Sequence, residues 1–225
     1  MGKGTRGELL DRLAGAIGSV TASHPLRVAV DGPPAAGKTT LADELALLLR
    51  SRGREAIRAP AESFRLPRAQ RYRRGEFSPE ANYHDSFDYG TLRRVLLDPL
   101  GPGGDRRYQH AVYDLGTDTA VSRPAATAPA DAVLLLDGVF LLRPELTGRW
   151  DLGIFVSAAF EQVPDRARIR DLARPGSTAG VERRLRTRYI PAQELYLAMA
   201  RPADHADIVV HNDEPLRPAW EVRSR

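Results

Sequence analysis

The chain has 225 residues and contains no cysteine. This absence excludes disulfide bonds and thiolate zinc sites, and it is typical of a cytoplasmic protein. Long apolar runs are also missing, because no segment reaches the roughly 20 apolar residues of a membrane-spanning helix. The amphipathic N-terminus does not resemble a secretory signal. The five histidines lack the spacing of metal ligands. We therefore expect a cytoplasmic protein with no membrane partner.

The overall composition fits a single globular domain over residues 1–225. Apolar residues make up 42% of the chain and charged residues 28%, which is ordinary for a soluble domain. The net charge of +4 suits a protein that binds anions, whereas a nucleic-acid binder usually shows a denser basic stripe. We expect no nucleic-acid partner, and the composition leaves a homo-oligomer open.

Strand-like and helix-like segments alternate along the chain. Helical patterns cover residues 5–19 (within an N-terminal segment 1–22), 39–52, 86–97, 161–173 and 180–200. Apolar, strand-like runs cover residues 27–30, 55–59, 132–138, 151–158 and 206–212. Between them we expect a long loop rich in proline and arginine at 61–80 and a β-hairpin at 105–123. This order predicts an α/β fold with a doubly wound, mainly parallel sheet.

The segment from Gly32 to Thr39, GPPAAGKT, matches the phosphate-binding loop pattern G-x-x-x-x-G-K-[ST]. A predicted strand precedes it and a predicted helix follows it, as the pattern requires. The glycines permit backbone conformations that place successive N–H groups around an anion at a helix N-terminus. The expected nucleotide contacts are Gly32, Pro33, Ala35, Ala36, Gly37, Lys38, Thr39 and Thr40.

Lysine is nearly absent from the chain, with two lysines against thirty-one arginines, and one of the two is Lys38 in this loop. An ammonium group is a compact charge on a thin stem that can reach the β- and γ-phosphates, whereas a planar guanidinium is wider. The hydroxyl of Thr39 is placed for Mg²⁺ beside those phosphates. The pattern therefore predicts binding of ATP or GTP together with Mg²⁺.

The missing motifs narrow the class of nucleotide-binding protein. The chain has no Asn-Lys-x-Asp element, which excludes a GTPase, and no transporter-type Gly-Gln signature. A small-molecule kinase, another ATPase and a binding module without chemistry remain open. Asp137 ends the apolar run LLLD, and the carboxyl ends of parallel strands face the ligand crevice. A carboxylate there can hold Mg²⁺ through its waters.

Several motifs together give the chain a recognisable order. They are the phosphate-binding loop, ESF, NYHDSFD, AVYDLGTDT, LLLDGVFLL, an arginine-rich segment, RYIPAQELY and ADIVV. In order and spacing the chain resembles the uridine kinase and phosphoribulokinase-like group of P-loop kinases over about residues 26–212. The resemblance implies a three-layer P-loop NTPase fold with helices on both faces of the sheet and a small β-hairpin insertion. It also makes residues 61–80 an acceptor loop and residues 166–182 a lid.

The resemblance implies roles for charged residues. Glu62 in AESF stands where the group carries an aspartate that accepts the proton of the attacking hydroxyl, and it is also a candidate Mg²⁺ contact. This glutamate is one methylene longer. Lid arginines would offset charge on the transferred phosphoryl group. We expect Arg166, Arg170 and Arg174 in this role beside Lys38, with Arg168 in solvent.

The acceptor site implied by the resemblance departs from a uridine site. The expected substrate contacts are Tyr83, His84, Asp85, Tyr113 and Arg188, although His84 alone is more often a surface residue. Uridine kinases carry a His and a Gln where this chain has Asp118 and Arg188, which weakens uridine as the acceptor. The sequence predicts Mg²⁺-dependent transfer of the γ-phosphoryl group of ATP or GTP to a hydroxyl of a nucleoside or sugar-like molecule. The alternative is a nucleotide-binding protein that has lost this transfer.

Overall fold

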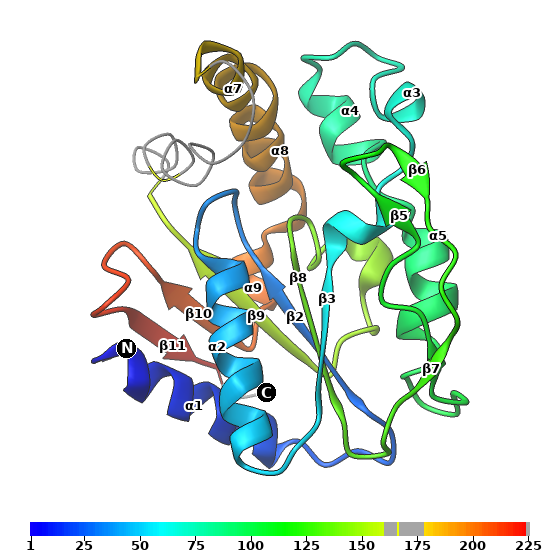
Figure 1. Ribbon diagram of the computed structural model, residues 1–225. Helices are drawn as coiled ribbons and strands as arrows, with labels where there is room; N and C mark the ends of the chain where they lie inside the picture. Colours follow the sequence, from blue (N-terminus) through cyan, green and yellow to red (C-terminus); the bar gives the residue numbers. More distant parts are fainter. Residues whose placement is uncertain (160–165, 167–177, 224–225) are drawn as a thin grey trace.

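The computed structural model describes residues 1–159, 166 and 178–223. A seven-stranded sheet in the order β1-β11-β10-β9-β2-β8-β3 forms its centre (Figure 1). The strands from β10 to β3 run parallel, and β11 and β1 add an antiparallel edge. The bounds of these strands are Gly2–Lys3 (β1), Leu26–Asp31 (β2), Ala56–Pro60 (β3), Val133–Gly138 (β8), Leu152–Ser157 (β9), Ile208–His211 (β10) and Ala219–Val222 (β11). The predicted doubly wound, mainly parallel sheet is confirmed.

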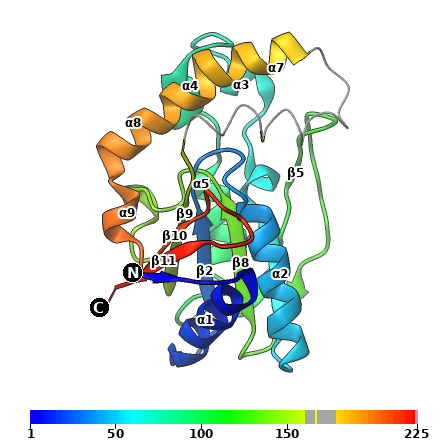
Figure 2. The ribbon, with the colours of Figure 1, turned by 90° about the vertical axis from the view of Figure 1, so that its left-hand side faces the viewer.

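The central strands read as continuous apolar runs because helices cover both of their faces. In β8, Val133 and Leu135 point into one hydrophobic core, and Leu134 and Leu136 point into the other. The helices α1 (Arg6–Ser19) and α2 (Lys38–Ser51) pack on the first face. The opposite face carries α5 (Tyr89–Leu92), η2 (Arg93–Leu97), α8 (Ile190–Ala200) and α9 (Pro202–His205). Figure 2 shows α2 on one side of the strands and α8 and α9 on the other, which makes three layers.

Local signals set the ends of the two helices on the first face. Thr5 caps α1, because its side chain accepts from the N–H of Glu8 while the carboxylate of Glu8 accepts from the N–H of Thr5. α2 starts directly after Gly37, whose φ of 92° only glycine adopts readily. Both helices agree within a residue or two with the sequence prediction.

Residues 61–80 differ from the loop that the sequence predicts, because they contain short helices. These are η1 (Ala61–Phe64), α3 (Arg68–Arg71) and the start of α4 (Pro79–His84). Ser78 caps α4 by accepting from the N–H of Ala81, and Pro79 stands in its first turn, where no N–H is needed. Such one-turn helices carry too few residues for a periodic pattern, so packing rather than sequence period specifies them.

The insertion predicted at 105–123 contains a small hairpin and extends further along the chain. β5 (Tyr113–Asp114) pairs with β6 (Thr119–Ala120). Outside this hairpin, β4 (Arg107–Tyr108) pairs with β7 (Ala126–Thr127), so the insertion reaches residue 127. In Figure 1 the hairpin lies beside β3 and below α3 and α4.

The carboxyl ends of β2, β3 and β8 meet at one edge of the sheet. In Figure 1, α3, α4 and α7 (Thr178–Arg184) lie beyond this edge. α4 packs against α8, so segments about a hundred residues apart enclose the same space. Within the residues that the structure describes, no helix is long and apolar enough to cross a membrane.

Candidate active site

The phosphate-binding loop joins β2 to α2 at this edge, and its two glycines are sterically required. A Cβ on Gly32 would lie 2.1 Å from the carbonyl oxygen of Val156, and a Cβ on Gly37 would lie 2.5 Å from Nδ2 of Asn212. The same Nδ2 donates to the carbonyl of Ala36 at 2.7 Å, which fixes the loop from the C-terminal side of β10. The loop is therefore a cradle of backbone that a larger residue would fill, as a phosphate site requires.

Lys38 lies inside this loop. Its side chain is 8% exposed, and Nζ donates to the carbonyl oxygen of Pro33 at 2.6 Å. Ala35, at the tip of the loop, has φ of 58°, and Thr39 and Thr40 are exposed in the first turn of α2. All the predicted nucleotide contacts therefore lie on one turn around the N-terminus of α2, an arrangement that fits bound phosphate.

Thr39 and Asp137 come together across the gap between α2 and β8. Oγ1 of Thr39 donates to Oδ2 of Asp137 at 2.5 Å, and Asp137 is 2% exposed. Within the described ranges no group of three or more His, Cys, Asp or Glu could hold a metal ion. Mg²⁺ binds oxygen ligands and keeps several waters. The two side chains therefore fit Mg²⁺ whose other ligands are phosphate oxygens and water.

Sequence reasoning missed the cation that pairs with Asp137. Nη2 of Arg58, on the neighbouring strand β3, donates to Oδ1 of Asp137 at 2.7 Å, and Nη1 donates to the carbonyl of Leu135. Nε of Arg58 also donates to Asp43 on α2. An arginine inside an otherwise apolar strand run was the available signal, since a buried charge requires a partner.

A second missed element lies directly below the loop. Asp31, fully buried at the end of β2, accepts from the N–H of Gly32 at 2.7 Å, from the N–H of Leu142 at 3.1 Å and from the hydroxyl of Tyr196 on α8. Burial raises the pKa of Asp31, and the hydroxyl of Tyr196 and the N–H of Leu142 oppose the shift. Burial together with the charge of Asp31 raises the pKa of Tyr196, so the phenol stays neutral and donates. This contact connects the start of the phosphate loop to α8.

Glu62 lies at the same edge as Asp137. It belongs to η1, directly after β3, and Pro60 of β3 is in register with Asp137 of β8. A Cβ on Gly138 would lie 2.4 Å from Cβ of Ala61, so this glycine permits η1 to pack on the end of β8. The carboxylate of Glu62 is 43% exposed and lies 4.0 Å from a guanidinium nitrogen of Arg65. It is accessible to a hydroxyl that enters from solvent.

Of the predicted lid arginines, the structure describes Arg166. Its guanidinium donates to the carbonyl of Asp213 at 2.8 Å, one residue after the Asn212 that fixes the phosphate loop. Arg166 therefore lies on the side of the loop at which β10 ends. Arg168, Arg170 and Arg174 fall outside the described residues.

The predicted acceptor residues of the NYHD segment occupy different environments. Tyr83 is buried, with its ring 5.2 Å from that of Phe140, and burial raises the pKa of its hydroxyl. His84 is exposed, and Asp85 accepts from Nε of Arg74 at 2.8 Å. Tyr83 thus belongs to the wall below the acceptor region, while His84 and Asp85 lie nearer its surface.

The remaining predicted acceptor residues, Tyr113 and Arg188, form hydrogen bonds with other groups of the protein. The hydroxyl of Tyr113 donates to Asp118, which also accepts from Nη2 of Arg71 at 2.9 Å. Arg188 is 1% exposed, and its guanidinium donates to the carbonyls of Arg71 and Glu76 at 3.2 and 2.8 Å. Its donors are therefore occupied by the backbone of the acceptor loop. This favours a supporting role for Arg188 over direct contact with an acceptor.

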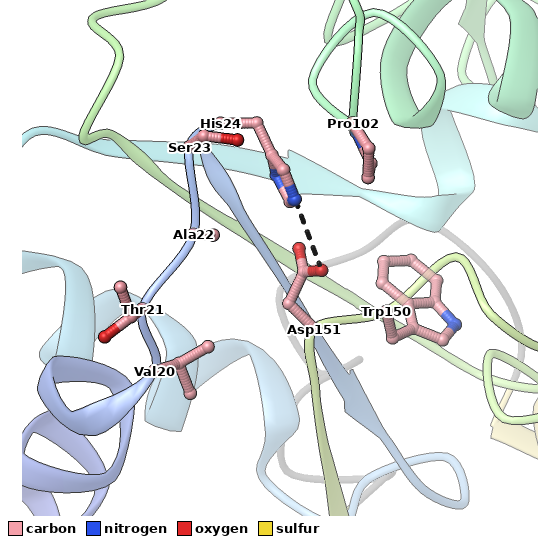
Figure 3. Close-up of a pocket in the computed structure, with 8 residues that line it drawn as sticks. All are labelled: Val20, Thr21, Ala22, Ser23, His24, Pro102, Trp150 and Asp151. Atoms are coloured by element: carbon pink, nitrogen blue, oxygen red, sulfur yellow. Dashed lines mark ion pairs between the residues drawn. The ribbon is translucent and has the colours of Figure 1, made fainter.

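A hollow of about 450 Å³ lies at the opposite edge of the sheet (Figure 3). Its wall includes His24, before β2, and Asp151, before β9, with 3.9 Å between Nε2 and Oδ1. Asp151 also pairs with the buried Arg27 at 3.0 Å, so its charge stabilises the strand ends. The phosphate loop is at the other end of these strands, and we assign no reaction to this hollow.

Known proteins with similar sequences or structures include kinases. The chain is 27% identical over 188 residues, 83% of its length and 74% of the other protein, to uridine-cytidine kinase B of Dictyostelium discoideum. Its fold matches a possible uridine kinase from Bacillus stearothermophilus with a TM-score of 0.70 and 24% identity, over 90% of this chain and 97% of that one. It also matches D-glycerate 3-kinase from Cryptococcus neoformans with a TM-score of 0.61 and 16% identity, over 83% and 88%.

The structural likenesses confirm the three-layer P-loop fold. No family model matches the chain. The sequence likeness and the folds, taken together, confirm the resemblance to the uridine kinase-like group of P-loop kinases.

Proposed function

We propose that the protein transfers the γ-phosphoryl group of ATP or GTP, with Mg²⁺, to a hydroxyl of a nucleoside or sugar-like small molecule. The observation that carries this proposal is the meeting of three groups at one edge of the sheet. They are the phosphate cradle with Lys38, the Thr39–Asp137 pair and the accessible carboxylate of Glu62. Similarity to a uridine-cytidine kinase supports the reaction class.

Different residues of the chain have different roles in the proposed reaction. The loop amides and Lys38 would hold the β- and γ-phosphates. Thr39 and Asp137 would hold Mg²⁺, which would neutralise charge on the phosphate oxygens. Glu62 accepts the proton of the attacking hydroxyl as the oxygen bonds to the γ-phosphorus and the bond to the nucleoside diphosphate breaks.

The lid arginines complete the proposed site. Arg166 donates a hydrogen bond to the carbonyl of Asp213, which is next to the Asn212 that fixes the phosphate loop. Together with Arg170 and Arg174 it would stabilise the negative charge on the group in transfer. Phosphoryl transfer depends mainly on such positioning and electrostatic stabilisation, so these side chains would act on kcat more than on nucleotide affinity.

Glu62 provides the decisive experiment. With Mg²⁺-ATP and a panel of nucleosides, vitamins and sugars, Glu62→Gln should lower kcat by about 10²–10⁴, because it keeps the size of the side chain and removes the proton acceptor. Glu62→Asp should retain activity, since it keeps the carboxylate. Glu80→Gln, which alters an exposed carboxylate of the same region, should leave kcat unchanged. A Glu62→Gln variant as active as the parent would remove Glu62 from the mechanism.

The second candidate function is nucleotide binding without transfer. It is favoured by Glu62 itself, which replaces the aspartate of the related kinases. If the parent, Glu62→Asp and Glu62→Gln all fail on every acceptor while ATP still binds, this second function becomes the better one. Measuring ATP binding by calorimetry in parallel with the turnover assay separates the two.

A further inference from the structure

Arg65 lies next to Glu62 in the acceptor region, and the proposed reaction gives it no role. It follows η1 and forms an isolated bridge with Phe87. Its side chain is 14% exposed, and its guanidinium carbon lies 4.3 Å from the centre of the Phe87 ring. The nearest carboxylate contact is Oε1 of Glu62, at 4.0 Å from Nη2. At this distance the two groups attract each other without a hydrogen bond.

Within the part of the chain that the structure describes, Nε of Arg65 differs from Nε of the neighbouring arginines because it makes no hydrogen bond. This nitrogen is fully buried. By contrast, Nε of Arg71 donates to the carbonyl of Leu66 at 2.7 Å, and Nε of Arg74 donates to Asp85. A buried cationic donor without a partner is costly, so a ligand that accepts from it would recover that cost.

A neutral donor packs on the same ring. Tyr89 lies 5.8 Å from Phe87 between ring centroids, and the guanidinium carbon of Arg143 lies 4.7 Å from the centre of the Tyr89 ring. Arg143 can only donate to the Tyr89 oxygen, so the buried O–H has no acceptor for its proton among the described residues. Burial raises the pKa of Tyr89 to about 12, so the hydroxyl keeps its proton. Arg65 and Tyr89 therefore both contact the ring of Phe87 with a donor that lacks an acceptor, and Arg65 is the one that lies close to the candidate base.

The pair has cations around it, with Arg143 beside Tyr89, and the carboxylate of Asp31 lies within electrostatic reach of Tyr89. Burial lowers the pKa of Arg188, and the charges of Arg65 and Arg71 lower it further, which places these guanidinium groups within electrostatic reach of one another. Asp118 already pairs with Arg71. Arg65 has Glu62 nearby, but Glu62 would lose its charge when it accepts a proton in the proposed reaction. An anionic group on the bound acceptor would then neutralise the positive charge of Arg65.

We infer that the acceptor carries a carboxylate or phosphate in addition to its reacting hydroxyl, and that this anion binds Arg65 with Tyr89 as a second donor. The inference rests on the proposed kinase function and defines the acceptor class more closely. A bidentate guanidinium suits the paired oxygens of either anion. A neutral nucleoside would leave the charge of Arg65 without an acceptor.

Measuring turnover of matched pairs of acceptors tests whether the acceptor is anionic. The pairs share a hydroxyl and differ in charge: D-glycerate and glycerol, pantothenate and panthenol, ribulose 5-phosphate and ribulose. We expect the full chain to prefer the anionic member of a pair by about ten- to hundredfold in kcat/KM, the range of a charge-assisted hydrogen bond. The first two pairs probe carboxylate, and the third probes phosphate.

Variants identify Arg65 as the source of the preference. Arg65→Gln should abolish the preference by lowering kcat/KM for the anionic member alone, and Tyr89→Phe should reduce it. Arg68→Gln is the matched control, because its side chain is 62% exposed and meets Glu76 only at 4.0 Å. If Arg65→Gln lowers both members of a pair equally, Arg65 positions Glu62 instead and the inference is wrong.

A binding measurement keeps this test separate from the kinase proposal. With the phosphate loop filled by a non-hydrolysable ATP analogue and Mg²⁺, inorganic phosphate or acetate should show NMR line broadening with the parent and the Arg68→Gln variant, and none with Arg65→Gln. Equal broadening with all three proteins, or none with the parent, overturns the inference. Transfer to neutral acceptors alone would also overturn it while supporting kinase activity. Anion binding at Arg65 without any transfer would leave the site in place and remove the kinase function.

Discussion

Replacing Tyr196 by phenylalanine probes the contact that joins the phosphate loop to α8. Asp31 is fully buried and has three donors: the N–H of Gly32 at 2.7 Å, the N–H of Leu142 at 3.1 Å and the hydroxyl of Tyr196. The substitution removes one donor from a buried carboxylate and keeps the ring. Hydrogen bonds to charged groups contribute about 1.5–3 kcal/mol, so the free energy of unfolding should fall by roughly 2 kcal/mol at neutral pH.

The loss should depend on pH with a defined sign. Burial raises the pKa of folded Asp31 above its usual 3.8. Protonated Asp31 therefore contributes to the free energy of unfolding. This contribution is fully present below pH 3.8 and is lost as the pH rises through the pKa of Asp31 in the folded protein. The hydroxyl of Tyr196 holds this pKa down, so Tyr196→Phe raises it further. The variant should lose most stability on the alkaline side, and the difference from the parent should shrink as the pH falls toward 4.

Urea unfolding followed by circular dichroism between pH 5 and pH 9 measures both effects. Tyr189→Phe is the matched control, since Tyr189 lies two turns earlier and is half-buried. Its unfolding free energy should change by less than about 0.5 kcal/mol. A Tyr196→Phe variant as stable as the control, or one whose deficit grows toward acid, would refute the role assigned to the Asp31 contact.

Two further predictions concern the nucleotide and metal sites. Lys38→Arg should abolish detectable transfer while the chain still folds, because the wider guanidinium does not fit where Nζ lies against the carbonyl of Pro33. Near-normal turnover would refute this size argument. Arg58→Met should lower the Mg²⁺ concentration for half-maximal rate several-fold, because it removes the cation 2.7 Å from Asp137. A higher Mg²⁺ requirement would instead mean that Arg58 positions Asp137 for the metal.

The sheet and the phosphate loop could be predicted because their signals are local. β8 is apolar at four successive positions, 133–136, since both faces are buried, and its run ends in Asp137. The loop pattern requires small residues at two positions, and the contacts of Gly32 and Gly37 account for both. Each of these features needs only a few neighbouring residues to be recognised, so the sequence alone identifies them.

Contacts between distant segments could not be predicted in the same way. Asp31 and Tyr196 are 165 residues apart, and Arg58 and Asp137 are 79 apart. Each pair forms because parallel strands and their crossover helices bring unrelated segments to one edge of the sheet. A sequence shows that a buried Asp or Arg needs a partner, but only the fold selects which partner it has.

The two departures from a uridine site also turn out to be connected. Taken separately, Asp118 and Arg188 are two lost substrate contacts. In the structure both bind Arg71: Asp118 accepts from its guanidinium at 2.9 Å, and Arg188 donates to its carbonyl at 3.2 Å. Asp118, whose side chain is 40% exposed, also accepts from the hydroxyl of Tyr113. The hairpin, the acceptor loop and η5 (Leu185–Tyr189) are therefore joined by one set of hydrogen bonds. Decay of a site would leave such groups unpaired. These pairings support our proposal that the acceptor site is built for a molecule other than uridine.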